Sequence, residues 1–235
     1  MNSRDHGKIF LVALGFGLLL ATGSLQALAD DYDCTGTVGA ITVDNLNVPQ
    51  NATCILNGTQ VEGNIFVRDN ATLYANAIRV DGNIQAGTAA RVEVHPGSVV
   101  GGDIQFDDGG LLLVDSVQID GSLQTFENTA SQIYTDNVIG GDLQAFGNTA
   151  GTAISANIIG GNLQAYDNLG GLTIWNNTIA ENLQCQGNSP PPTGGNNIVG
   201  GDRENQCANL QGGDPPPSPP PASGTFQIFL TYVVH

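Results

Sequence analysis

The stretch Ile139-Gly140-Gly141-Asp142-Leu143-Gln144 is one copy of a phrase that fills most of the chain. In each copy an aliphatic residue is followed by small or polar residues, and the fifth position is apolar in all copies but the last. A period this regular is the signature of a solenoid, whose repeats pack only against their neighbours. The copies begin at 19- or 20-residue steps, at Val61, Val80, Val100, Ile119, Ile139, Ile159, Ile179 and Val199.

The positions within each copy predict strands and corners. The first and fifth positions are apolar and are expected to point into the core. Glycine at the third position is expected to supply a positive φ. The Asn, Asp and Ser side chains at the fourth position are expected to bond nearby backbone and to stack in ladders. Glutamine at the sixth position alternates with the buried fifth position and should face outward.

Further elements recur at the same period and complete each coil. A second apolar run, such as 133–135 or 154–156, predicts another strand in every coil. Two asparagine series mark the remaining corners, namely Asn128, Asn148, Asn168 and Asn188, and Asn137, Asn157, Asn177 and Asn197.

The mature chain lacks helical periodicity, and right-handed crossovers are the default for parallel strands. The sequence therefore predicts an all-β fold, a right-handed single-stranded parallel β-helix with about 20 residues per coil. A left-handed hexapeptide helix is the alternative, but its six-residue pattern is not found in this chain. We expect capping coils over 30–60 and repeats over 61–211. Arg203 replaces the buried leucine of the last copy and predicts the end of the core.

The first 29 residues have the features of a secretory signal peptide. Arg4 and Lys8 precede an apolar stretch at 9–20, and Ala27-Leu28-Ala29 supplies a small-x-small cleavage pattern. Cleavage would leave 6 − 2 = 4 basic and 22 − 1 = 21 acidic residues, a net charge of −17. Such a surface repels nucleic acid and anionic lipid. We therefore expect an exported protein, extracellular, at the cell surface or periplasmic, with no membrane span after cleavage.

Four cysteines in an exported chain predict two disulfide bonds. Cys34 and Cys54 are 20 residues apart, or one coil, and Cys185 and Cys207 are 22 apart. Adjacent coils lie about 4.8 Å apart, within the range of about 4.4–6.8 Å that a disulfide requires between Cα atoms. The other pairings would bridge several coils. The solenoid therefore predicts Cys34–Cys54 and Cys185–Cys207, one at each end.

The end of the chain departs from the repeat. Residues 212–224 form a proline-rich linker, and 225–235 read as a β-strand on a tether. An exposed strand of this kind is expected to dock, either on its own solenoid or, by strand addition, on a second copy. Head-to-tail addition would produce fibres. Its apolar face consists of Phe226, Ile228, Leu230, Tyr232 and Val234.

The repeat phrase and the closing segments 182–193, 197–201 and 206–210 resemble a group of exported bacterial hypothetical proteins. That resemblance implies a β-helix with no assigned activity. The Gly-Asn/Asp-Ile/Leu coils are also similar to those of bactofilins, which polymerise end to end inside cells. Export and disulfide-tied ends depart from the bactofilin pattern and argue against intracellular polymerisation.

The candidate ligand-binding surface is a strip of aromatic residues beside the glutamine column. If these side chains face outward, they suit stacking on the sugar rings of a neutral polysaccharide. The strip comprises Phe106, Phe126, Phe146 and Tyr166, with Gln124, Gln144 and Gln164. Inward-facing rings would be core instead.

No residue set predicts catalysis, a metal or a cofactor. Asp107-Asp108 resembles the paired aspartates of polygalacturonase-like hydrolases, but the sequence supports a loop better, since the histidine and basic residues of such sites are not matched. We therefore expect a non-catalytic structural or interaction protein that self-assembles through 225–235. A carbohydrate-binding module is the alternative, and a polysaccharide-degrading enzyme is a distant third.

Overall fold

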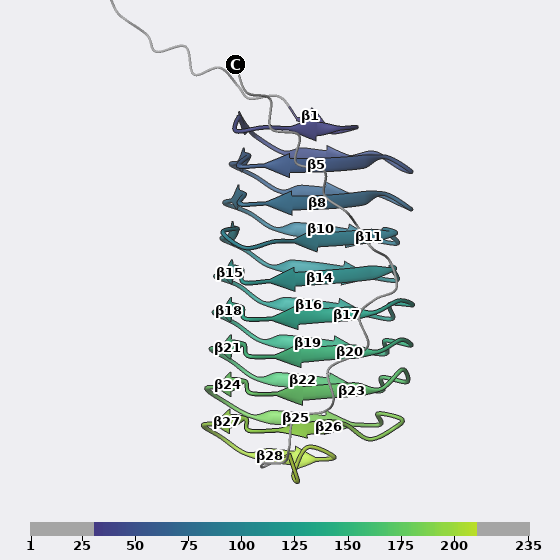
Figure 1. Cartoon of the computed structure of the whole chain (residues 1–235), viewed down its shortest axis with the longest axis vertical. Coiled ribbons are helices and arrows are strands. Elements are labelled where there is room, and N and C mark those ends of the chain that lie inside the picture. Colours follow the sequence, from purple (N-terminus) through teal and green to yellow (C-terminus); the bar gives the residue numbers. More distant parts are fainter. Residues whose placement is uncertain (1–30, 211–235) are drawn as a thin grey trace, which may run out of the picture.

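The structure is a computed structural model that describes residues 31–210, which form a parallel β-solenoid (Figure 1). Successive coils stack along the long axis from the first strand to the last. Within 31–210 every regular element is a strand, which confirms the all-β solenoid with about 20 residues per coil. The predicted signal peptide at 1–29 and the predicted strand at 225–235 lie outside the described residues.

Three parallel sheets run the length of the solenoid. Sheet A contains β1 (Tyr32–Asp33), β4 (Leu46–Val48), β7 (Ile65–Val67), β10 (Ile84–Gly87), β13 (Ile104–Asp107), β16 (Leu123–Phe126), β19 (Leu143–Phe146), β22 (Leu163–Tyr166), β25 (Leu183–Gln186) and β28 (Arg203–Asn205). Sheet B contains β2 (Thr37–Val38), β5 (Thr53–Asn57), β8 (Thr72–Asn76), β11 (Arg91–Val94), β14 (Leu111–Asp115), β17 (Gln132–Thr135), β20 (Thr152–Ser155), β23 (Leu172–Trp175) and β26 (Thr193–Gly195). Sheet C contains β3 (Thr42–Val43), β6 (Gln60–Val61), β9 (Arg79–Val80), β12 (Val99–Val100), β15 (Gln118–Ile119), β18 (Val138–Ile139), β21 (Ile158–Ile159), β24 (Thr178–Ile179) and β27 (Ile198–Val199).

The repeat phrase begins in sheet C, turns a corner and ends in sheet A. Leu143 pairs with Leu163 and Gln144 with Gln164, so equivalent positions of neighbouring coils lie side by side. This register places each column of the sequence pattern on one line along the axis.

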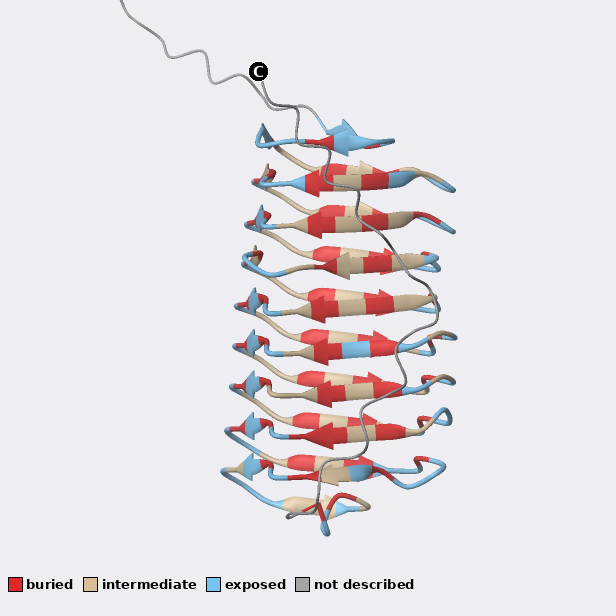
Figure 2. Ribbon diagram, viewed as in Figure 1, coloured by how far each residue is buried: buried red, intermediate tan, exposed pale blue. Residues whose placement is uncertain are grey.

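The core follows the predicted alternation (Figure 2). Each first- and fifth-position aliphatic side chain from Val61 to Leu183 is no more than 1% exposed. The last copy differs, because Val199 and Arg203 are only half-buried. Arg203 pairs in register with Leu183 in the last strand of the described residues. The buried aliphatic columns therefore stop before Arg203, as predicted, but the core itself extends beyond that residue to Cys207 and Leu210.

The Asn, Asp and Ser column at the fourth position forms the predicted ladder. From Asn64 to Asp202, each main-chain N–H donates to the side-chain oxygen one coil earlier, at 2.6–3.1 Å. The prediction that the preceding glycines have positive φ is wrong, since none of them does. Their role is close approach. A Cβ on Gly82 would lie 2.5 Å from the Gly63 carbonyl oxygen and 2.6 Å from Asn64 Oδ1.

Positive φ occurs instead at the other two corners, immediately before the inward-pointing asparagines. Left-handed residues let the chain turn sharply and direct the next side chain into the core. The residues concerned are Glu127, Gly147, Asp167 and Gly187 at one corner, and Asp136, Ala156, Asn176 and Asn196 at the other.

The two asparagine series at these corners are buried ladders. Asn157, 1% exposed, is typical. Its Oδ1 accepts from the main-chain N–H and the Nδ2 of Asn137, at 3.0 and 2.9 Å. Its Nδ2 donates to the carbonyl of Tyr134 at 2.9 Å and to Asn177 Oδ1 at 3.0 Å. Each amide therefore satisfies backbone groups that the corner would otherwise bury without partners.

At each end of the solenoid a disulfide bond links two adjacent coils. The predicted disulfides are present, with Cα atoms 5.4 Å apart in Cys34–Cys54 and 5.2 Å apart in Cys185–Cys207. At the C-terminal end Gln206 extends the asparagine ladder, because its Oε1 accepts from the main-chain N–H and the Nδ2 of Asn188.

Candidate functional site

The outer face of sheet A carries the predicted glutamine column as a continuous ladder. The Nε2 of Gln144 donates to Gln164 Oε1 at 2.8 Å and its Oε1 accepts from Gln124 at 3.0 Å. The ladder begins at Gln105 and ends at Glu204, with donor–acceptor distances of 2.8–3.1 Å. All the glutamines in it are half-buried, so their amides also border solvent.

Three of the four predicted aromatic residues lie beside this ladder on the outer face. Phe126, Phe146 and Tyr166 are half-buried and follow one another in register. The inclusion of Phe106 in the strip is wrong, because its side chain is 0% exposed and lies in the core. Phe106 pairs with Thr125, and Asp107 pairs with Phe126. An offset of one residue moves a side chain to the opposite face of a strand, which explains the error.

The aromatic rings do not offer a uniform stacking platform. Phe146 and Tyr166 stack on each other, with centroids 5.0 Å apart and an interplanar angle of 15°. Each ring therefore covers a face of the other. Phe126 meets Phe146 edge-on, at 5.4 Å and 63°. The Tyr166 hydroxyl donates to Gln184 Oε1 at 3.1 Å. Phe126 is at the N-terminal end of the strip, and its partner in the preceding coil is Asp107, which is not aromatic.

A hollow of about 340 Å³ opens beside Phe126. The position of Phe126 is occupied by Asp107 in the preceding coil and by Gly87 in the coil before that. The outward side chain at this position therefore becomes shorter from coil to coil and is missing at Gly87. A Cβ placed on Gly87 would meet no atom within 4 Å. The lining comprises Gln85, Ala86, Gly87, Gln105, Asp107 and Phe126. One aromatic ring, one carboxylate and two amides thus surround the hollow.

Asp107 is the last residue of β13, and Asp108 follows it in the turn with a φ of 51°. Partial burial, followed by the negative charge of Asp108, raises the pKa of the Asp107 carboxyl above its usual value. A main-chain hydrogen bond from Asp108 opposes the rise. Asp107 therefore occupies a site that disfavours its charged form and would favour a hydroxyl donor.

The hollow was only partly predictable. Phe126 is the one lining residue that belongs to the predicted ligand strip. Gln85 and Gln105 belong to the predicted glutamine column but not to that strip, and Asp107 is predicted only as part of a loop. Phe66 is also not identified from the sequence as an outward aromatic. Phe66 pairs with Gln85, and the guanidinium of Arg68 lies 5.0 Å from its ring centroid. Aligning the coils by register, with Gly87 opposite Asp107 and Phe126, would have revealed the gap.

Other features of the described residues bear on location and chemistry. No group of three or more His, Cys, Asp or Glu side chains within 31–210 is arranged to hold a metal ion. The two disulfides are compatible with an oxidising, exported location. Over the same described part of the chain, no helix has the length and apolarity needed to cross a membrane.

Comparisons with protein-family models, with curated proteins and with solved structures find no match for this chain.

Proposed function

We propose that this chain is a non-catalytic interaction protein of the cell exterior that binds a neutral glycan on sheet A. The observation that carries the proposal is the hollow formed by Gln85, Gln105, Asp107 and Phe126. The solenoid supports it rigidly, since β10, β13 and β16 each pair with strands on both sides.

The chemistry of the lining matches a sugar ring. Phe126 supplies an apolar surface for the C–H face of a pyranose. The side-chain amides of Gln85 and Gln105 can donate to and accept from sugar hydroxyls, and the Asp107 carboxylate accepts from them. One ring and three polar groups of this kind favour a polyhydroxylated ligand over an apolar one.

Charge favours a neutral polymer. The chain has 22 acidic and 6 basic residues, so an anionic polysaccharide would meet a repulsive surface. The glutamine ladder runs on from Gln105 for five further coils, to Glu204, and offers a polar track along which further sugar residues would lie.

A glycan array probed with the chain from residue 30 tests the proposal. We expect binding to neutral glycans that falls at least about tenfold, or about 1.4 kcal/mol, in Phe126→Ala and Asp107→Asn. Tyr74→Ala, which removes a half-buried aromatic from sheet B, is the matched control and should bind like the parent. Absence of binding by the parent, or equal binding by Phe126→Ala, would contradict the proposal.

Export completes the proposal, and self-assembly is a separate prediction. The signal-peptide pattern at 1–29 and the resemblance to exported bacterial β-helix proteins support an extracellular, surface or periplasmic location. Self-assembly into fibres through 225–235 stays a prediction, because that segment lies outside the described residues. At the N-terminal end, β1, β2 and β3 each have a strand neighbour on one side only among the described residues. Strand addition would take place at such an edge.

A further inference from the structure

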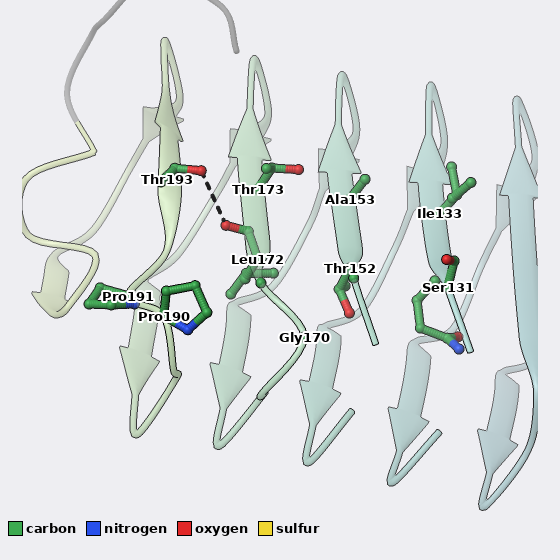
Figure 3. A pocket seen from close by; sticks show the side chains of 13 residues that line it. Ser131, Ile133, Thr152, Ala153, Gly170, Leu172, Thr173, Pro190, Pro191 and Thr193 are labelled. Carbon is green, nitrogen blue, oxygen red and sulfur yellow. Dashed lines mark hydrogen bonds between the residues drawn. The ribbon is translucent and has the colours of Figure 1, made fainter. Parts of the chain in front are cut away.

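A groove of about 430 Å³ lies on sheet B near the C-terminal end of the solenoid (Figure 3). It crosses four coils, and its outward column consists of Ile133, Ala153, Thr173 and Thr193, which pair in register. Ile133 bounds one end and Pro190 and Pro191 bound the other. The space between them exists because the intervening coils present Ala153, Gly151 and Gly171.

The groove is uncharged and largely apolar. Its lining contains no Asp, Glu, Lys, Arg or His, although the whole chain carries 22 acidic residues. Ile133 is 38% exposed there and presents its side chain to the hollow. Aliphatic side chains gathered in an uncharged hollow favour an uncharged, apolar occupant.

The C-terminal segment of the same chain has matching chemistry. Residues 225–234 contain no Asp, Glu, Lys, Arg or His. Every second residue from Phe226 to Val234 is apolar, so an extended segment would have one apolar face. Three successive residues of that face, such as Ile228, Leu230 and Tyr232, span about 13 Å. The four coils of the groove span about 14 Å at the usual strand spacing, a close match.

The tether is long enough for docking within one molecule. The described residues end at Leu210, which is buried at the C-terminal cap, and the groove ends in the neighbouring coil at Thr193. Residues 211–224 number fourteen, and a proline-rich chain covers about 3.1 Å per residue, or about 43 Å in total. A short tether also raises the effective concentration of the segment to the millimolar range, which favours its own groove over that of another copy.

We propose that residues 225–235 dock with their apolar face in this groove of their own solenoid. Docking in this way removes the exposed strand that would otherwise promote aggregation. It also opposes fibre formation, because the docked segment is not free to add to the edge of another molecule.

Methyl NMR of the chain from residue 30 tests the proposal. Replacing Phe226, Ile228, Leu230 and Tyr232 together by Ser changes only residues beyond the solenoid, so folding of the coils is not at stake. We expect the methyl resonances of Ile133, Ala153 and Leu172 to shift. Those of Ile158 and Ile198, which are 54% and 68% exposed on sheet C, should not move. No shift in the groove, or shifts on sheet C or at the N-terminal edge, would overturn the proposal.

A second variant tests the groove from the other side. Ala153→Arg fills the groove with a charged side chain, and Thr178→Arg places the same side chain at an exposed position of sheet C. The methyl resonances of Leu230 and Val234 should move to free-chain positions in Ala153→Arg alone. The parent should be monomeric by light scattering, with spectra independent of concentration. Groove shifts that vanish on dilution together with a dimer would assign the groove to a second copy and overturn intramolecular docking.

Discussion

Replacing Asn157 by Ala tests the role of the buried asparagine ladders. The substitution removes the acceptor of the Asn137 main-chain N–H and a donor to the Tyr134 carbonyl. Asn137 Nδ2 keeps its bond to the Val114 carbonyl, and Asn177 Oδ1 still accepts from the main-chain N–H of residue 157. The buried Asn137 main-chain N–H therefore loses its acceptor, at about 1–3 kcal/mol, and the Tyr134 carbonyl, which lies within the β17–β20 ladder, loses a second donor, at about 1 kcal/mol. We expect a loss of about 2–4 kcal/mol in the free energy of unfolding.

Gln144→Ala is the matched control. It also removes an amide from the middle of a ladder, with bonds of 2.8 and 3.0 Å to its neighbours. Because Gln144 is half-buried on the outer face of sheet A, water can replace those bonds. We therefore expect a loss below about 1 kcal/mol.

Equilibrium denaturation of the disulfide-bonded chain from residue 30 measures both effects. Trp175 is the single tryptophan of the chain and is 9% exposed, so its fluorescence reports unfolding of the coils. The slope of the free energy of unfolding against denaturant concentration should be the same in the parent, Asn157→Ala and Gln144→Ala. If the two substitutions cost the same within about 0.5 kcal/mol, burial does not decide the strength of the ladders and the reasoning is refuted.

Three further predictions concern single sites. Thr152 Oγ1 is buried and has no hydrogen-bond partner in the described residues, so Thr152→Val should stabilise the fold by about 1 kcal/mol, and a lower denaturation midpoint would contradict this. The double variants Cys34→Ser/Cys54→Ser and Cys185→Ser/Cys207→Ser each open a loop of 20 or 22 residues. Each should lose about 3 kcal/mol by chain entropy, and unchanged thermal unfolding would contradict that account. Because the pKa of Asp107 is raised, the folded state holds this proton more tightly than the unfolded chain does. Ionisation of Asp107 therefore lowers the stability of the fold as pH rises through the window from 3.8, the ordinary pKa, to the raised pKa of the folded state. Asp107→Asn should therefore be more stable than the parent at pH 7 and equal to it below that window, and an advantage that persists in acid would contradict the assignment.

The coil architecture was predictable because the first and fifth columns repeat without exception until Arg203. The disulfide pairing followed from the same period, since Cys34 and Cys54 are one coil apart. The glycine column was recognised, but its physical reason was not. A sequence pattern shows that a position excludes side chains, and it does not show whether φ or close approach is responsible, as Gly82 illustrates.

Inward and outward positions were harder to predict in the second strand of each coil. In β17 it is Tyr134 that is buried and Ile133 that is exposed. Tyr134 is accommodated because its hydroxyl donates to Thr125 Oγ1 at 3.0 Å or to Gln132 Oε1 at 3.2 Å. Gln132 lies on the same strand, but Thr125 comes from β16 in another sheet, and no local pattern indicates that it meets Tyr134. Burial also raises the pKa of Tyr134 well above its usual value.

The candidate site depends on register in the same way. Phe106 precedes Phe126 by 20 residues, and Phe126 precedes Phe146 by 20 residues. Yet Phe106 lies in the core and Phe126 borders the hollow. The hollow itself arises from side chains that are short or missing, at Asp107 and Gly87. Such a gap becomes visible only when the coils are aligned by their strand pairing.

Hydrogen exchange measured with and without a bound glycan tests the central claim most directly. The chain from residue 30 would be saturated with a neutral oligosaccharide selected on the array, and exchange followed by mass spectrometry. The proposal predicts slower exchange in peptides covering 85–90, 105–110 and 124–129, at the hollow and the turns that follow it. Slower exchange confined to sheet B or sheet C, or no change at saturation, would contradict a glycan site on sheet A.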